Sequence, residues 1–451
     1  MSISSRRAAR FDLTAGPVTG SMLLFAAPMI AGNLLQQLYN VADTFIVGRC
    51  IGADALAAVG ASYSAMVFLT SVLLGLCMGS GVLFSMLWGA GETDRMKQSF
   101  AISFGFIAVI TVAIEALSLA CLPLFLRLLQ IPPEIMDMTA EYLRIIFYGL
   151  AFTFIYNYFA SLLRAVGRSA PPLVFLGVSA VLNIVLDLVF VLCFDMGVAG
   201  AAWATITAQG VSAFGTAAWC LICMPQLRPE RRHIRFDAGI FRQLAQYSLL
   251  TCAQQSVMNF GILMVQGLVN SFGVVAMAAF AAGVKIDSFA YMPVQDFGNA
   301  FATFIAQNKG AGKQERIRRG LRSAVLCALV FCVVVSAAVF VFAQPLMRLF
   351  VDASETAVIA EGVRYLRIEG ACYCGIGCLF LFYGLYRGLG RAGFSLVLTV
   401  VSLGTRVALA YLLAPVAGLP GVWWAIPIGW VLADALGAWK YGSIRSQLTD
   451  A

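Results

Sequence analysis

The chain has 451 residues, of which 61% are hydrophobic and 12% are charged, with a mean hydropathy of +0.88 and a formal net charge of +8 at pH 7. Soluble proteins carry roughly 25% charged residues, and their cores stop growing beyond about 250–300 residues, so this composition excludes a soluble globular protein. The single histidine, His233, excludes a His-based catalytic triad and a His-rich metal site.

Twelve stretches are long and apolar enough to cross a bilayer, because a spanning helix needs about 20 mostly apolar residues. The first six run over 21–47, 54–88, 98–126, 138–163, 171–193 and 198–224. The second six run over 243–271, 275–308, 321–347, 357–386, 394–415 and 419–441. We therefore predict an all-α membrane protein with twelve transmembrane helices: an N-terminal six-helix lobe (1–224), a basic linker (225–242) and a C-terminal six-helix lobe (243–451).

The charges predict the orientation of these spans. The N-terminal sequence MSISSRRAARFDLTAGP is basic and precedes an apolar helix without a small-residue cleavage site, so we expect the first helix to be retained. Most of the 30 basic residues fall in segments on the same side as this N-terminus. By the positive-inside rule, both termini are expected in the cytoplasm and the protein in the cell membrane as a multi-pass protein.

The two halves repeat one another. AEYLRI at 140–145 returns as VRYLRI at 363–368, and LLRAVGRSA at 162–170 returns as LYRGLGRAG at 385–393. GAGETDRMKQ at 89–98 returns as GAGKQERIRR at 310–319. Six spans in each half make the repeats parallel, related by an axis along the membrane normal, an arrangement typical of alternating-access carriers.

Several of these segments resemble the multidrug and toxic compound extrusion (MATE) family, in its bacterial drug-exporting branch. They are PMIAGNLLQQLYNVADTFIVGR in the first helix, the following GADALAAVG, and the paired RAVGRS and RGLGRA loops. The resemblance covers essentially the whole chain and its repeat. It implies a V-shaped pair of lobes that exports organic cations against inward flow of Na⁺ or H⁺.

One face of the first predicted helix is polar. Asn33, Gln36, Asn40 and Asp43 fall within about 120° of arc on an otherwise apolar helix. Charged groups inside a bilayer are costly, so Asp43 is a functional candidate.

A second polar face lies on the helix over 171–193, where Asn183 and Asp187 are four residues apart, and Thr205 follows on the next helix. Carboxylate, amide and hydroxyl oxygens are hard ligands suited to a small cation, and two neighbouring carboxylates could instead share a proton. The plainer interpretation is that such residues hydrogen-bond helices together. The MATE resemblance implies that Asp43, Asn183, Asp187 and Thr205 form the coupling-ion site.

The second half lacks these carboxylates. Aligned by the repeat, Asp43 falls near Ile262, Asn183 near Thr405 and Asp187 near Leu409, with Arg406 close by. The coupling site is therefore predicted in the N-terminal half only.

Other polar residues within the spans are candidates for a substrate cavity. The helix over 243–271 carries no acid, unlike that of some family members, whereas Glu369 is a partial match to their C-lobe acids. The acids Asp287 and Asp296 are interpreted as cavity residues or as structural ion partners. The candidates are Asn33, Gln36, Asn40, Gln255, Asn259, Asp287, Asp296 and Glu369.

Together these features predict an ion-coupled antiporter that exports organic, mostly cationic, drugs and toxic compounds. The alternative is a flippase for a lipid-linked saccharide or another amphiphile from the same superfamily. We expect no enzymatic activity, no cofactor, no nucleic-acid partner and, without a GxxxxGK[ST] motif, no nucleotide. The expected partners are small amphiphilic cations, membrane lipids and Na⁺ or H⁺, and the expected form is a monomer.

Overall fold

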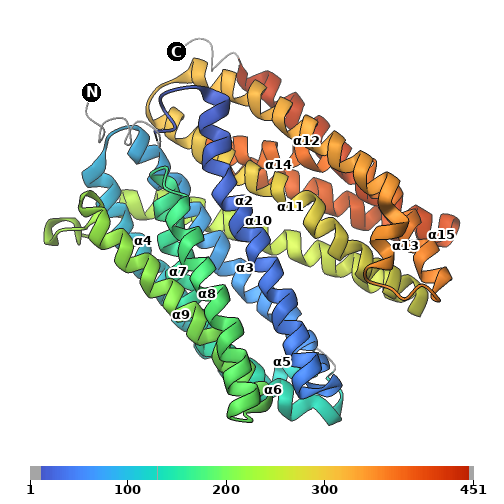
Figure 1. The fold of residues 1–451 in the computed structure, drawn as a ribbon. Coiled ribbons are helices and arrows are strands. Elements are labelled where there is room, and N and C mark those ends of the chain that lie inside the picture. Colours follow the sequence, from blue (N-terminus) through green and yellow to red (C-terminus); the bar gives the residue numbers. More distant parts are fainter. Residues whose placement is uncertain (1–11, 129–130, 446–451) are drawn as a thin grey trace. The chain divides into compact units, whose positions relative to one another are not determined.

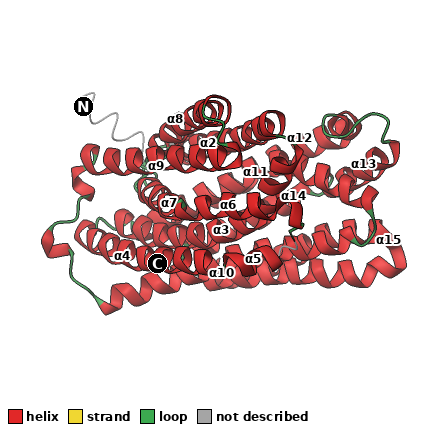
Figure 2. Ribbon diagram, turned by 90° about the horizontal axis from the view of Figure 1, so that it is seen from below, coloured by secondary structure: helices red, strands yellow, loops and turns green. Residues whose placement is uncertain are grey.

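The computed structural model describes residues 12–128 and 131–445, and throughout this part every regular element is a helix (Figure 2). The first half comprises α2 (Val18–Ile46), α3 (Ala53–Gly89), α4 (Thr93–Ala120), α5 (Leu122–Leu128), α6 (Pro133–Tyr148), α7 (Leu150–Ala165), α8 (Ala170–Leu188) and α9 (Gly197–Cys223). Two π-helical segments, η1 (Val47–Ile51) and η2 (Val189–Cys193), continue α2 and α8, and two 3₁₀ turns, η3 (Pro225–Leu227) and η4 (Arg231–His233), lie in the linker. The second half comprises α10 (Ala238–Asn270), α11 (Val274–Gly310), α12 (Gln314–Arg348), α13 (Thr356–Gly370), α14 (Tyr373–Gly388) and α15 (Ala392–Arg445).

The spans match the twelve predicted ones when two bent helix pairs and one interrupted long helix are taken into account. Within the described residues, nine helices are long and apolar enough to cross a membrane, and two bent pairs, α6 with α7 and α13 with α14, add one span each. The helix α15 has 54 residues and would extend about 80 Å if straight, far more than one bilayer core. Its backbone leaves helical geometry at Gly418, so it supplies two spans. The prediction of an all-α membrane protein is confirmed.

The two bent pairs occupy equivalent places in the two repeats. The axes of α6 and α7 meet at 41° around Gly149, and those of α13 and α14 meet at 51° after Gly370. Hydropathy predicted each pair as one continuous span, because it records the length and composition of a segment and not its direction.

The helices form two compact units (Figure 1). The amino unit is Ala31–Cys252, and the carboxy unit contains the described residues of Met1–Ile30 together with those of Ala253–Ala451. These bounds differ from the expected lobes, 1–224 and 243–451, because each unit boundary falls inside a helix. One lies in α2 after Ile30 and the other in α10 after Cys252, 222 residues further along, which is the distance of the sequence repeat.

Contacts in the carboxy unit explain why the start of α2 belongs there. The side chain of Leu13 is buried in the carboxy unit's core. Arg316 of α12 donates hydrogen bonds to the backbone carbonyls of Leu13, Ala15 and Gly16 at 3.1, 2.6 and 2.7 Å. Asn308 of α11 donates a further one to Leu13 O at 3.1 Å. The segment before α2 is therefore tied to the second half of the chain.

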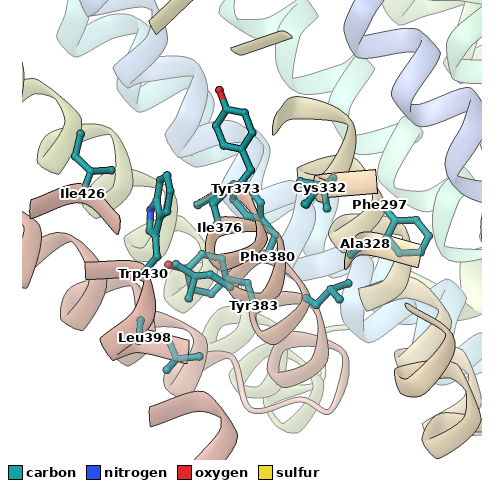
Figure 3. Packing of buried hydrophobic residues seen from close by; sticks show 14 of the residues in the cluster. Phe297, Ala328, Cys332, Tyr373, Ile376, Phe380, Tyr383, Leu398, Ile426 and Trp430 are labelled. Carbon is teal, nitrogen blue, oxygen red and sulfur yellow. The ribbon is translucent and has the colours of Figure 1, made fainter. Parts of the chain in front are cut away.

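Aromatic side chains fill much of both cores. In the carboxy unit, Figure 3 shows Tyr373, Phe380 and Tyr383 of α14 grouped with Cys332 of α12 and Trp430 of α15.

In the amino unit, the buried Tyr158 of α7 packs against the rings of Phe84, Phe100 and Phe104. Its hydroxyl donates to Phe100 O at 2.7 Å, so the one polar atom of this ring has a partner.

Glycines allow close helix contacts in the carboxy unit. A Cβ on Gly384 or Gly388 of α14 would lie 2.4 Å from Gly298 O or 2.6 Å from Ala302 O of α11. Small residues at such crossings let backbones approach, which is how helices pack inside a membrane.

Candidate functional site

The packing of α8 against α9 positions two of the predicted coupling residues. These helices lie side by side (Figure 1), and Ser179 Oγ of α8 donates to Ala208 O of α9 at 2.8 Å. One turn further along α8, Asn183 Nδ2 approaches Thr205 Oγ1 of α9 at 3.5 Å. Asn183, Asp187 and Thr205 are all buried at this contact.

Asp43 of α2 lies beside Asp187, close enough for the two carboxyl groups to interact electrostatically. One Asp43 oxygen, both Asp187 oxygens and Asn183 Oδ1 are buried without a donor among the described residues. An ionised carboxylate only accepts hydrogen bonds, so two of them can bond to each other only through a proton. The structure thus brings together the four predicted coupling residues around oxygens that lack a donor.

Two tyrosines line this carboxyl pair. Tyr39 of α2 and Tyr142 of α6 both interact electrostatically with Asp43 and Asp187, and Tyr142 is buried. Sequence reasoning did not select Tyr142 as a site residue. The signal was present in the repeated motifs AEYLRI and VRYLRI, which place Tyr142 and Tyr365 at equivalent positions.

The two helices that carry the carboxylates end in the same unusual way. The π-helical segments η1 and η2 begin four residues after Asp43 and two residues after Asp187, and they contact each other. Short π-helical segments within helices occur frequently at functional sites. Among the described residues, the second half carries no such segment.

The carboxy unit contains a different acidic centre. Asp287 of α11 accepts a hydrogen bond from Tyr365 of α13 at 2.5 Å and another from Tyr373 of α14. Glu369 of α13 lies close enough to Asp287 for the two acids to interact electrostatically, and Arg406 of α15 attracts both of them. All five side chains are buried or nearly so. Asp287 therefore has two donors and a nearby positive charge.

The remaining cavity candidates are distributed between the two units. In the amino unit, Asn33 and Asn40 of α2 are half-buried and Gln36 is exposed. In the carboxy unit, Gln255 and Asn259 of α10 are half-buried and joined by a hydrogen bond from Asn259 Nδ2 to Gln255 O at 3.2 Å.

Asp296 is buried on α11, nine residues after Asp287. No group of three or more His, Cys, Asp or Glu side chains suited to a metal ion occurs within residues 12–128 and 131–445.

The comparisons with known proteins agree with this architecture. The MatE family profile matches residues 28–189 and 249–412, and the second match begins 221 residues after the first. The probable multidrug resistance protein YpnP of Bacillus subtilis (strain 168) is 30% identical over 395 residues, 87% of each chain. The probable multidrug resistance protein NorM of Thermotoga maritima is 27% identical over 416 residues, 89% of this chain and 87% of the relative.

A solved structure shares the fold: a MATE protein crystallised in complex with MaL6 superposes with a TM-score of 0.91, at 23% identity, over 97% of this chain and 99% of that one. The duplicated helical architecture and its intramembrane acids define a multi-pass membrane transporter. The chain belongs to the MATE family of multidrug efflux transporters.

Proposed function

We propose that this transporter exports organic cations by antiport with Na⁺ or H⁺, and that Asp43, Asn183, Asp187 and Thr205 bind the coupling ion. The observation that carries the proposal is the contact between two intramembrane carboxyl groups whose buried oxygens have no donor. Two unpaired charges at such a site would be costly. A proton or a small cation would supply what the oxygens lack.

Occupancy of this site would change the balance between conformations of the amino unit. With the ion bound, its attraction to the carboxylates of Asp43 and Asp187 holds α2 against α8. Without the ion, the two carboxylates repel each other and weaken the contact between these helices. A ligand shifts a conformational equilibrium only by binding one state more tightly. We propose that the ion binds the state in which Asp43 and Asp187 are together.

The preference for cations rests on the charges inside the spans. Asp296 and Glu369 are acids buried in the carboxy unit, and negative charge there favours a positively charged substrate. The relatives' names identify them as multidrug resistance proteins, which supports a broad range of substrates. We also propose that both termini are cytoplasmic, because the basic segments lie on the N-terminal side.

The test measures efflux of a fluorescent organic cation from liposomes that contain the purified protein, driven separately by a Na⁺ gradient and by a pH gradient. We expect one gradient to drive transport. Asp43→Asn and Asp187→Asn should each lower the coupled rate by at least about tenfold, because one carboxylate cannot replace the pair.

The matched control is Glu115→Gln, which removes an acid from α4 in the same unit and should retain transport. Full activity in Asp43→Asn would contradict the coupling role of the pair. Absence of cation transport under either gradient would contradict the proposed substrate class.

A further inference from the structure

In the linker between the two halves, two large apolar side chains are exposed to the surroundings next to arginines. Ile234 is 68% exposed and Phe236 is 72% exposed, and Arg235 lies between them. Arg231 and Arg242 are also exposed, and none of these three arginines forms an ion pair within the described part of the chain.

This segment is fixed to the amino unit. His233 is buried, its Nδ1 accepts a hydrogen bond from Glu230 N at 3.0 Å, and its Nε2 lies 3.0 Å from Asp94 Oδ1 of α4. Gln98 Nε2 donates to Arg235 O at 3.1 Å. Hydrogen bonds to α4 therefore fix the backbone that carries Ile234 and Phe236.

The contacts between the linker and α4 indicate where Ile234 and Phe236 lie relative to the membrane-spanning part of α4. The linker advances along α4, from Asp94 opposite His233 to Gln98 opposite Arg235, and the ring of Phe241 reaches Phe106 at 5.4 Å.

The segment of α4 over 99–114 contains no charged residue, and its Val109 and Val112 side chains are 70% and 64% exposed, as expected of a lipid-facing surface. Arg235 is thus level with the last polar turn of α4 before its apolar stretch.

We propose that residues 231–242 form an interfacial anchor that binds anionic phospholipids of the adjacent leaflet. Ile234 and Phe236 enter the boundary between headgroups and acyl chains, and Arg231, Arg235 and Arg242 contact the phosphate groups. Apolar side chains next to arginines are the combination with which proteins bind anionic membrane surfaces. The anchor would make the linker, and the start of α10 that follows it, sensitive to the charge of the membrane.

The experiment compares hydrogen–deuterium exchange of the full-length protein in nanodiscs of phosphatidylcholine alone and in nanodiscs that contain phosphatidylglycerol. We expect the amides of residues 234–238 to exchange at least about threefold more slowly with the anionic lipid, because bound headgroups restrict access of water. The loop over 349–355 also has two exposed apolar residues, Leu349 and Phe350, but only one arginine beside them, and its exchange should not change.

Two pairs of substitutions separate the apolar from the ionic contribution. Ile234→Ser with Phe236→Ser, and separately Arg235→Gln with Arg242→Gln, should each abolish the difference between the two membranes. The control, Arg319→Gln with Arg322→Gln, removes the same charge from exposed positions of α12 and should keep it.

Equal exchange in the two membranes, or a difference that survives both pairs of substitutions, would overturn the proposal. So would protection that appears only when soluble cell proteins are added, since the occupant would then be a protein. Should the serine variants fail to fold, the comparison of Arg235→Gln with Arg242→Gln against the control pair on α12 still tests the proposal.

Discussion

The two acidic centres differ in what surrounds their carboxyl groups. Asp43 and Asp187 contact each other with no donor on three of their oxygens, whereas Asp287 receives two tyrosine hydroxyls and lies near Arg406. An acceptor supplied with donors is part of the packing, and one without donors is available to an ion. The same residue type therefore has two environments in one chain.

Much of the first centre was predictable from sequence, because a polar face on an apolar helix identifies its members individually. Asp43, Asn183 and Asp187 stood out in this way. The donors to Asp287 were not predictable, because a tyrosine within an apolar span has the same sequence context whether its hydroxyl meets an acid or a lipid.

At this scale we predict that Asp287→Ala lowers the stability of the protein. The substitution leaves the hydroxyls of Tyr365 and Tyr373 without the carboxylate that accepts their hydrogen bonds, and Arg406 with one neighbouring acid, Glu369, in place of two. We expect a loss of about 1–3 kcal/mol of unfolding free energy, measured as a lower Tm in detergent. Asp137→Ala, at an exposed position of α6, is the control and should leave Tm unchanged. An unaltered Tm for Asp287→Ala would show that the centre does not stabilise the fold.

The transmembrane helices were the feature of the fold most predictable from sequence, but irregularities within them were not predictable. Every predicted span contains a helix, because about 20 apolar residues in a row have few alternatives in a bilayer. The bends at Gly149 and after Gly370 were not predicted. Neither were the π-helical segments that follow Asp43 and Asp187, since tertiary contacts decide them.

Close packing of α3 on the first part of α10 supplies a prediction for a helix contact. A Cβ on Gly79 would lie 2.5 Å from Ser248 Cα and 2.5 Å from Tyr247 O, so Gly79→Val must separate the two helices. We expect a much lower yield of monodisperse protein in size-exclusion chromatography. Gly105→Val on α4 adds the same side chain where nothing lies within 4 Å, and should behave as wild type. Equal yields from the two variants would contradict the contact.

At the scale of the whole molecule, α2 and α10 each belong to both units. The sequence repeat predicted two halves in chain order, whereas contacts assign the first part of each half to the unit built from the other half. Hydropathy and repeat matching could not reveal this, because they compare segments along the chain and carry no information on which segments touch.

We therefore predict that neither half folds alone. A chain split between Pro229 and Glu230 should give little stable protein from either fragment expressed singly, since each lacks the half-helix that completes its unit. Co-expression should restore a complex that copurifies through a tag on one fragment. A single fragment that is monodisperse and as thermally stable as the complex would contradict this expectation.

Such an exchange at equivalent positions has the form of a domain swap within one polypeptide. In a dimer of a six-helix ancestor, the same exchange would occur between two copies of one chain. The first half of helix 1 of each copy would then pack in the other copy. Fusion of two such genes would then only tie together partners that were already interlocked. One consequence concerns inherited defects: a damaging substitution before Ile30 would unfold the unit encoded by the opposite half of the gene.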